Sequence, residues 1–188
     1  MDMFNRRHMI ALGLAGLLAA CGTPDPNPLS RAARGEMQLA DIVVTAEGAG
    51  FESGAARDYT SRIAPDLDAA LSREFADRLG RGGRWKMLVE VSRLNLAGGT
   101  STALGRDQSR LSGAVRIVDP AGALRASYTI QVLAGEAAES RTGTVIGAVA
   151  NSAGGYYRDL LAGFSRDARA QVLGADLPGQ RLARRISN

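Results

Sequence analysis

Histidine and cysteine are almost missing from this 188-residue sequence, which contains one of each, His8 and Cys21. Beyond residue 21 the chain therefore cannot supply a Ser-His-Asp or Cys-His nucleophile system, a zinc site built on these residues, or a histidine or cysteine ligand to haem. Lysine is equally scarce: Lys86 stands between Trp85 and Met87, so it cannot complete a P-loop, which requires Gly-Lys-Ser/Thr. Carboxylate chemistry and an oxygen-ligated divalent cation remain possible, so a hydrolase of that kind is a third alternative. We expect a protein that is not an enzyme and that uses no cofactor and no metal.

Long apolar runs are missing as well. The most apolar N-terminal stretch, residues 9–20, is uncharged over twelve residues, whereas a membrane-spanning helix needs about 20. The positive residues Arg6, Arg7 and His8 precede it, and the small residues Ala19 and Ala20 end it. This order predicts a signal peptide over residues 1–20. Residues 6–10, RRHMI, also resemble a twin-arginine export signal.

The end of this segment, Leu18-Ala19-Ala20-Cys21, resembles the lipobox of bacterial lipoproteins. The resemblance implies that Cys21 receives a diacylglyceryl group, becomes the first residue after cleavage and is then acylated. Three acyl chains would hold the protein in a leaflet, because stable anchoring needs at least two. The resemblance also implies a periplasm-facing protein of the bacterial cell envelope, and Gly22 favours the outer over the inner membrane. The alternative is an ordinary secreted protein with a cysteine near its cleavage site.

Composition divides the rest of the chain into three parts. Residues 21–36 contain three of the six prolines and predict a lipidated, extended tether. Residues 37–174 carry the apolar patterning of one periplasmic α/β domain, and residues 175–188 predict a basic flexible tail. The net charge is +4, and every basic residue except Lys86 is an arginine. Such a mild charge gives no reason to expect nucleic acid as a partner.

Hydrophobic periodicity within residues 37–174 predicts the element order β-α-β-β-β-α. The first expected elements are a strand around residues 42–44 and an amphipathic helix within 58–80 that has Pro65 in its first turn. A strand over 85–98 follows, with a bulge near Ser92. The last elements are a hairpin whose strands flank a turn at 119–122 and a second amphipathic helix that ends near 174. The apolar face of the hairpin requires a cover. We therefore predict a two-layer α/β sandwich of about four mostly antiparallel strands, with two helices on one face.

This order, the hairpin turn after Val118-Asp119-Pro120 and the glycine-rich stretch before the last helix resemble small periplasmic domains of curli-secretion and transport-auxiliary lipoproteins, across residues 37–174. The resemblance implies a non-enzymatic accessory or scaffold role in envelope assembly or transport, with an envelope protein as partner. Pore formation is not expected, because the curli pore uses long amphipathic hairpins and this chain has one short hairpin. The alternative is a module that binds lipid or a small ligand, with the apolar segment 142–157 as one wall of its pocket.

The candidate partner-docking face consists of Arg110, Arg116 and Arg125. Their spacing places them on the open face of the hairpin, where like charges on adjacent strands repel unless an anion or acidic partner compensates them. Simple solvation of an antiparallel face is the other explanation. Reversing the charge of Arg116 and Arg125 is expected to abolish co-purification of a partner.

Two pairs of carboxylates are considered as candidate catalytic residues, and they are weaker candidates than the arginines. Asp66 and Asp68 are two residues apart and diverge on a helix, while Glu74 and Asp77 can converge but are explained by a solvated helix face. Neither pair predicts a general acid and base. The loop at 48–54 reads GxGxxxG and departs from the GxGxxG dinucleotide fingerprint, so it is interpreted as a flexible connection.

Overall fold

The computed structural model describes residues 27–97, 108–134 and 153–174. These residues form one five-stranded sheet and four helices. In chain order they are α2 (Arg31–Glu36), β1 (Leu39–Thr45), β2 (Gly50–Phe51), α3 (Gly54–Arg57), α4 (Ile63–Glu74), β3 (Trp85–Asn95), β4 (Ser109–Val118), β5 (Leu124–Ala134) and α7 (Ala153–Leu173).

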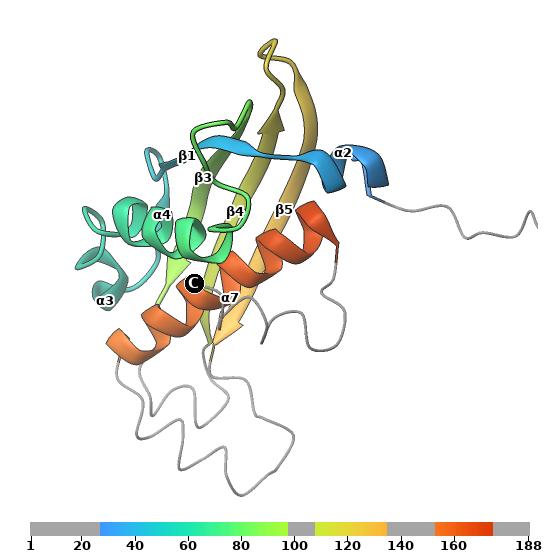
Figure 1. Ribbon diagram of the computed structural model, residues 1–188. Coiled ribbons are helices and arrows are strands. Elements are labelled where there is room, and N and C mark those ends of the chain that lie inside the picture. Colours follow the sequence, from blue (N-terminus) through green and yellow to red (C-terminus); the bar gives the residue numbers. More distant parts are fainter. Residues whose placement is uncertain (1–26, 98–107, 135–152, 175–188) are drawn as a thin grey trace, which may run out of the picture.

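The sheet has the order β1-β3-β4-β5, and the short strand β2 pairs with β3 next to β1 (Figure 1). Strands β3, β4 and β5 are antiparallel, whereas β1 and β2 run parallel to β3. The parallel pair follows from the connection, because α4 lies between β1 and β3 and returns the chain to the same end of the sheet. The predicted bulge is confirmed by a register shift between Val91 and Arg93.

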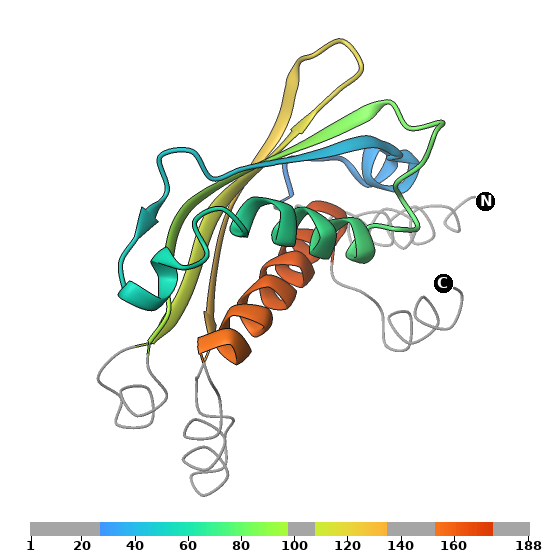
Figure 2. The same cartoon turned by 90° about the vertical axis from the view of Figure 1, so that its left-hand side faces the viewer.

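Two helices cover one face of the sheet. Helix α4 contacts β1, and α7 contacts β4 and β5, so that the two helices form a single layer (Figures 1 and 2). Every second residue of the central strands points into this layer, which produces the alternating burial along β3, β4 and β5. The predicted α/β two-layer sandwich is confirmed. None of the helices in the described part of the chain is both long and apolar enough to cross a membrane.

The segment before β1 differs from its prediction as an extended tether. Residues 31–36 form α2, which Ser30 caps by accepting a hydrogen bond from the Ala33 N–H. Leu29 is buried in the core. Asn27 donates from Nδ2 to the carbonyl of Gln171 (2.6 Å) and accepts at Oδ1 from the Tyr128 hydroxyl (2.8 Å). The folded domain therefore begins by residue 27, because contacts to distant residues hold this proline-containing segment.

The predicted hairpin turn is present between β4 and β5. Asp119 Oδ1 accepts the backbone N–H groups of Ala121 and Ala123, both at 2.9 Å, and Gly122 takes the left-handed conformation with φ 82°. The donors from Ala123 and Ala121, together with the Arg125 guanidinium, hold the pKa of Asp119 below its ordinary value. Asp119 is thus a structural residue of the turn.

Candidate functional site

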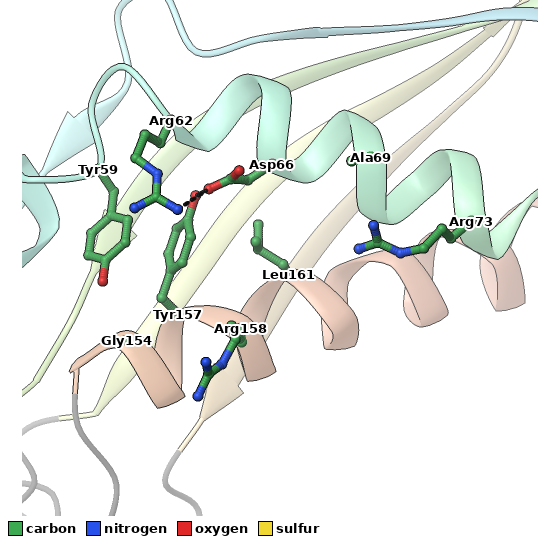
Figure 3. Close-up of a pocket in the computed structure, with 9 residues that line it drawn as sticks. All are labelled: Tyr59, Arg62, Asp66, Ala69, Arg73, Gly154, Tyr157, Arg158 and Leu161. Atoms are coloured by element: carbon green, nitrogen blue, oxygen red, sulfur yellow. Dashed lines mark hydrogen bonds and ion pairs between the residues drawn. The ribbon is translucent and has the colours of Figure 1, made fainter.

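A groove of about 380 Å³ lies between α4 and α7 (Figure 3). Its volume falls within the range of small-molecule sites. The residues that line it come from α4, α7 and the connection before α4: Tyr59, Arg62, Asp66, Ala69, Arg73, Gly154, Tyr157, Arg158 and Leu161. Figure 3 shows that the two helices run side by side in the same direction, with their N-terminal ends at the same end of the groove.

Two of the residues that line the groove are small. Ala69 on α4 and Gly154 on α7 contribute almost no side chain to the space between the helices. Leu161 points from α7 toward α4 and supplies an apolar surface (Figure 3). A longer side chain at Ala69 or Gly154 would occupy part of the groove, because protein interiors pack without such open spaces.

One hydrogen-bond cluster connects the helices at the N-terminal end of the groove. The Tyr157 hydroxyl donates to Asp66 Oδ2 at 3.0 Å, and Arg62 Nη2 lies 3.4 Å from the same oxygen. The rings of Tyr59 and Tyr157 stack with centroids 4.0 Å apart, and the Arg62 guanidinium lies 5.6 Å from the Tyr59 ring centroid. Asp66, the carboxylate of the groove lining, is thus already engaged by a hydroxyl and a guanidinium.

Tyr157 keeps its proton in this environment. Burial disfavours the phenolate, and the hydrogen bond to Asp66 disfavours it further, so the pKa of Tyr157 lies well above its ordinary value. General acid–base catalysis needs a group whose pKa lies near the working pH. Tyr157 is therefore suited to donate a hydrogen bond and not to accept a proton from a substrate.

Positive charge exceeds negative charge in the groove. The lining residues include three arginines, Arg62, Arg73 and Arg158, and one carboxylate, Asp66. Within the three described ranges, neither Arg73 nor Arg158 forms an ion pair, and both side chains are exposed. The N-terminal ends of α4 and α7 add a favourable field for negative charge at the same place. The arrangement can bind an anionic group beside an aromatic and apolar surface.

The same two helices are joined differently toward their C-terminal ends. Arg169 of α7 is 6% exposed and donates from Nη1 and Nη2 to the two carboxylate oxygens of Asp77 at 2.7 and 2.8 Å. It also donates to the carbonyl of Glu74 at 2.9 Å, and its guanidinium lies 5.6 Å from the Phe75 ring centroid. At this end of the helix pair, a buried side chain of α7 therefore binds the end of α4 and the residues that follow it.

The predicted docking arginines lie away from the groove, on the open face of the sheet. Arg110 and Arg116 are on the side of β4 opposite to its buried residues. Arg116 pairs with Glu90 of β3 at 2.5 Å, and Arg125 pairs with Asp119 at 2.6 Å. The repulsion expected among the three arginines is therefore reduced by carboxylates of the chain itself. The predicted lipidation residue, Cys21, lies outside the described residues.

The acidic residues considered from the sequence have separate roles. Asp66 points toward α7 at the groove, while Asp77 binds Arg169 as described above. The loop at 48–54 contains β2, and Ser53 caps α3, so this connection is ordered. No group of three or more His, Cys, Asp or Glu side chains in the described part of the chain is placed to hold a metal ion.

Sequence reasoning did not identify Arg73, Arg158 and Tyr157 as site residues. A signal was present in α7, where Tyr157, Leu161, Ser165 and Arg169 repeat every four residues and form one stripe of the helix. A charged residue on a stripe that is otherwise largely apolar indicates a specific partner on the facing helix. The predicted glycine-rich wall, 142–157, contributes Gly154 and Tyr157 to the groove, and its residues 142–152 lie outside the described residues.

Comparisons with known proteins give distant structural likenesses. No protein family and no curated protein sequence matches the chain. A crystal structure of a "putative lipoprotein from Caulobacter crescentus CB15" is 16% identical with a TM-score of 0.42, and the match covers 77% of this chain and 96% of that one. The PelC dodecamer from Paraburkholderia phytofirmans is 14% identical with a TM-score of 0.34, covering 76% of this chain and 95% of that one. These likenesses are too distant to assign a function.

Proposed function

We propose that this chain is a lipid-anchored lipoprotein of the bacterial cell envelope, facing the periplasm, that acts as a non-enzymatic accessory or scaffold protein in envelope assembly or transport. The lipobox-like Leu18-Ala19-Ala20-Cys21 supports the anchor, with the outer membrane favoured over the inner by Gly22. The expected likeness to curli-secretion and transport-auxiliary lipoproteins belongs to this proposal.

The observation that carries a binding role is the charge of the groove between α4 and α7. Its lining holds three arginines and one carboxylate, and this carboxylate already accepts a hydrogen bond from Tyr157. A protonated tyrosine and an engaged aspartate provide no general base, whereas Arg73 and Arg158 can bind a carboxylate or phosphate group. The groove therefore favours recognition of an acidic partner over catalysis.

Two surfaces can meet such a partner, and a pair of matched charge reversals separates them. We expect Arg73→Glu/Arg158→Glu to abolish recovery of the partner after crosslinking in the native envelope and mass spectrometry. Arg116→Glu/Arg125→Glu tests the open sheet face in the same way, where Glu90 and Asp119 already compensate the arginines. If both double variants recover the same crosslinked proteins as the unmodified chain, a docking role for either surface is contradicted.

The volume of the groove favours a second candidate function, the binding of a small anionic ligand. Its lining combines arginines with Tyr59, Tyr157 and Leu161, which suits a ligand with an acidic group and an apolar body. Native mass spectrometry of the non-lipidated Cys21→Ser chain distinguishes the two functions, because a carrier retains its ligand and a scaffold does not. For a carrier, Arg73→Ala and Arg158→Ala should each weaken binding about tenfold, since each removes a charge-assisted hydrogen bond.

A further inference from the structure

The lipid anchor, if Cys21 carries it as proposed above, is connected to the domain by a short link. Asn27 is fixed by its hydrogen bonds to Gln171 and Tyr128, so residues 21–26 alone span the distance from the lipid to the folded domain. Six residues reach about 20 Å at full extension, whereas the predicted tether of 21–36 would have reached more than twice as far. One end of the domain is therefore held close to the membrane surface.

The surface at this end is built from three elements. Figure 2 shows α2, the connection between α4 and β3, and the C-terminal end of α7 together at one end of the domain. The connection is joined to α2 and to the residues that follow it. Arg78 Nη1 donates to the Gly35 carbonyl of α2 at 2.7 Å, and the Arg84 N–H donates to the Gln38 carbonyl at 3.0 Å. The chain that leads to Cys21 and residues 78–86 thus belong to the same end.

The charge of this end is positive. Residues 78–86, RLGRGGRWK, contain four cations, Arg78, Arg81, Arg84 and Lys86, and no carboxylate. Arg81 and Arg84 are exposed and form no ion pair within the described part of the chain. The carboxylates at this end include Asp77, which binds Arg169 and lies 3.7 Å from Arg78, and Asp41, which is opposite Lys86 in the sheet. They also include Glu36 on α2 and Asp167 on α7, which accepts a hydrogen bond from Gln171.

We propose that residues 78–86 form a membrane-docking surface for anionic phospholipid headgroups. The short link brings this surface within reach of the bilayer, and each arginine near an anionic surface gives about a fivefold preference for the docked orientation. Trp85, the only tryptophan of the chain, is half-buried within the same run, and tryptophan is enriched at membrane interfaces. A bilayer is favoured over a protein partner because the anchor itself delivers this end to a bilayer.

Docking at this end orients the candidate groove. Fourteen residues of α7 separate Gln171, which binds Asn27, from Tyr157 in the groove, so the two lie about 20 Å apart along the helix axis. The end of the groove at Tyr157 then faces away from the membrane, toward the acidic partner or ligand proposed above.

Trp85 is a native probe for the test. The full lipidated protein is placed in vesicles that contain dansyl-labelled lipid headgroups, either in phosphatidylcholine alone or in phosphatidylcholine mixed with phosphatidylglycerol. We expect energy transfer from Trp85 to the headgroups to be higher in the anionic vesicles, and to fall when salt screens the charges. Flotation of the same samples measures attachment of the protein to the vesicles independently of the energy transfer.

Charge-reversed variants identify the surface. Arg81→Glu/Arg84→Glu changes the charge by four units and should lower the ratio of docked to undocked protein by roughly 600-fold, which removes the gain in anionic vesicles. Arg81→Glu alone should reduce it, while the matched control Arg57→Glu, exposed on α3, should not. Equal transfer in both vesicle types, or an unchanged gain in the double variant, contradicts docking even when the protein floats. A protein that floats with neither vesicle type contradicts the lipid anchor, and the docking with it.

Discussion

The two ends of the α4–α7 pair differ in how the helices are joined. Near the link to Cys21, the buried Arg169 connects α7 to Asp77 through two short hydrogen bonds and to the backbone of Glu74. At the opposite end the Tyr157 hydroxyl donates to Asp66 across the helices, beside an open groove. The same pair of helices is therefore joined by a buried ion pair at the end near Asn27 and carries an arginine-lined groove at the other.

The largest effect is expected from breaking the ion pair between Arg169 and Asp77. Arg169→Ala removes one partner of a nearly buried ion pair and leaves Asp77 without its main donor. We expect a loss of about 2 to 3 kcal/mol in the free energy of unfolding, below the full cost for a buried pair because Asp77 is 34% exposed. Urea denaturation measures it. Arg166→Ala, exposed on the same helix, should change stability by less than about 0.5 kcal/mol. Equal losses in the two variants would show that the ion pair does not join the helices.

A smaller effect is expected at the groove. Tyr157→Phe keeps the ring that stacks on Tyr59 and removes only the hydroxyl that donates to Asp66. The expected loss is about 1 kcal/mol, the usual net value of one hydrogen bond. A loss as large as that of Arg169→Ala would contradict the difference between the two ends.

The alkaline pH dependence of stability gives the smallest effect. Tyrosine in the unfolded chain loses its proton near pH 10, whereas the pKa of Tyr157 in the folded protein is raised by burial and by Asp66. Below pH 10 both states keep the proton. Above it the unfolded state releases a proton that the folded state retains, so the free energy of unfolding falls as pH rises. Tyr157→Phe should flatten this decline, measured by urea denaturation between pH 8 and pH 11. If the free energy of unfolding of Tyr157→Phe fell equally with pH, the decline would be due to titratable groups other than Tyr157.

Local patterns predicted the sheet and helices well. Period-two alternation identified the hairpin of β4 and β5, the slip of phase located the bulge at Ser92, and Pro65 lies in the first turn of α4 as expected. These features depend on neighbouring residues, which is why the sequence predicts them. The parallel pairing of β1 with β3 was less apparent, because it depends on how the helical connection crosses the sheet.

The groove and the start of the domain depend on distant residues and were missed. Tyr157 and Asp66 are 91 positions apart, and Arg169 and Asp77 are 92 apart. Asn27 donates a hydrogen bond to the carbonyl of Gln171, 144 positions away. Because composition carries no information about such a distant contact, the proline-rich segment was predicted to be a tether, whereas it is packed against the domain. On the open face of the sheet, alternation placed Arg116 on the correct side of β4. Its ion pair with Glu90 was not predicted, because that requires knowledge of the register between β3 and β4.

The state of Cys21 in the protein isolated from membranes is the most direct test of a lipid-anchored domain. Mass spectrometry of the intact protein and of its N-terminal peptide should show a chain that begins at Cys21 and carries acyl groups. A mature chain that begins at another residue, or a Cys21 without lipid, would contradict both the anchor and the orientation of the groove away from the membrane.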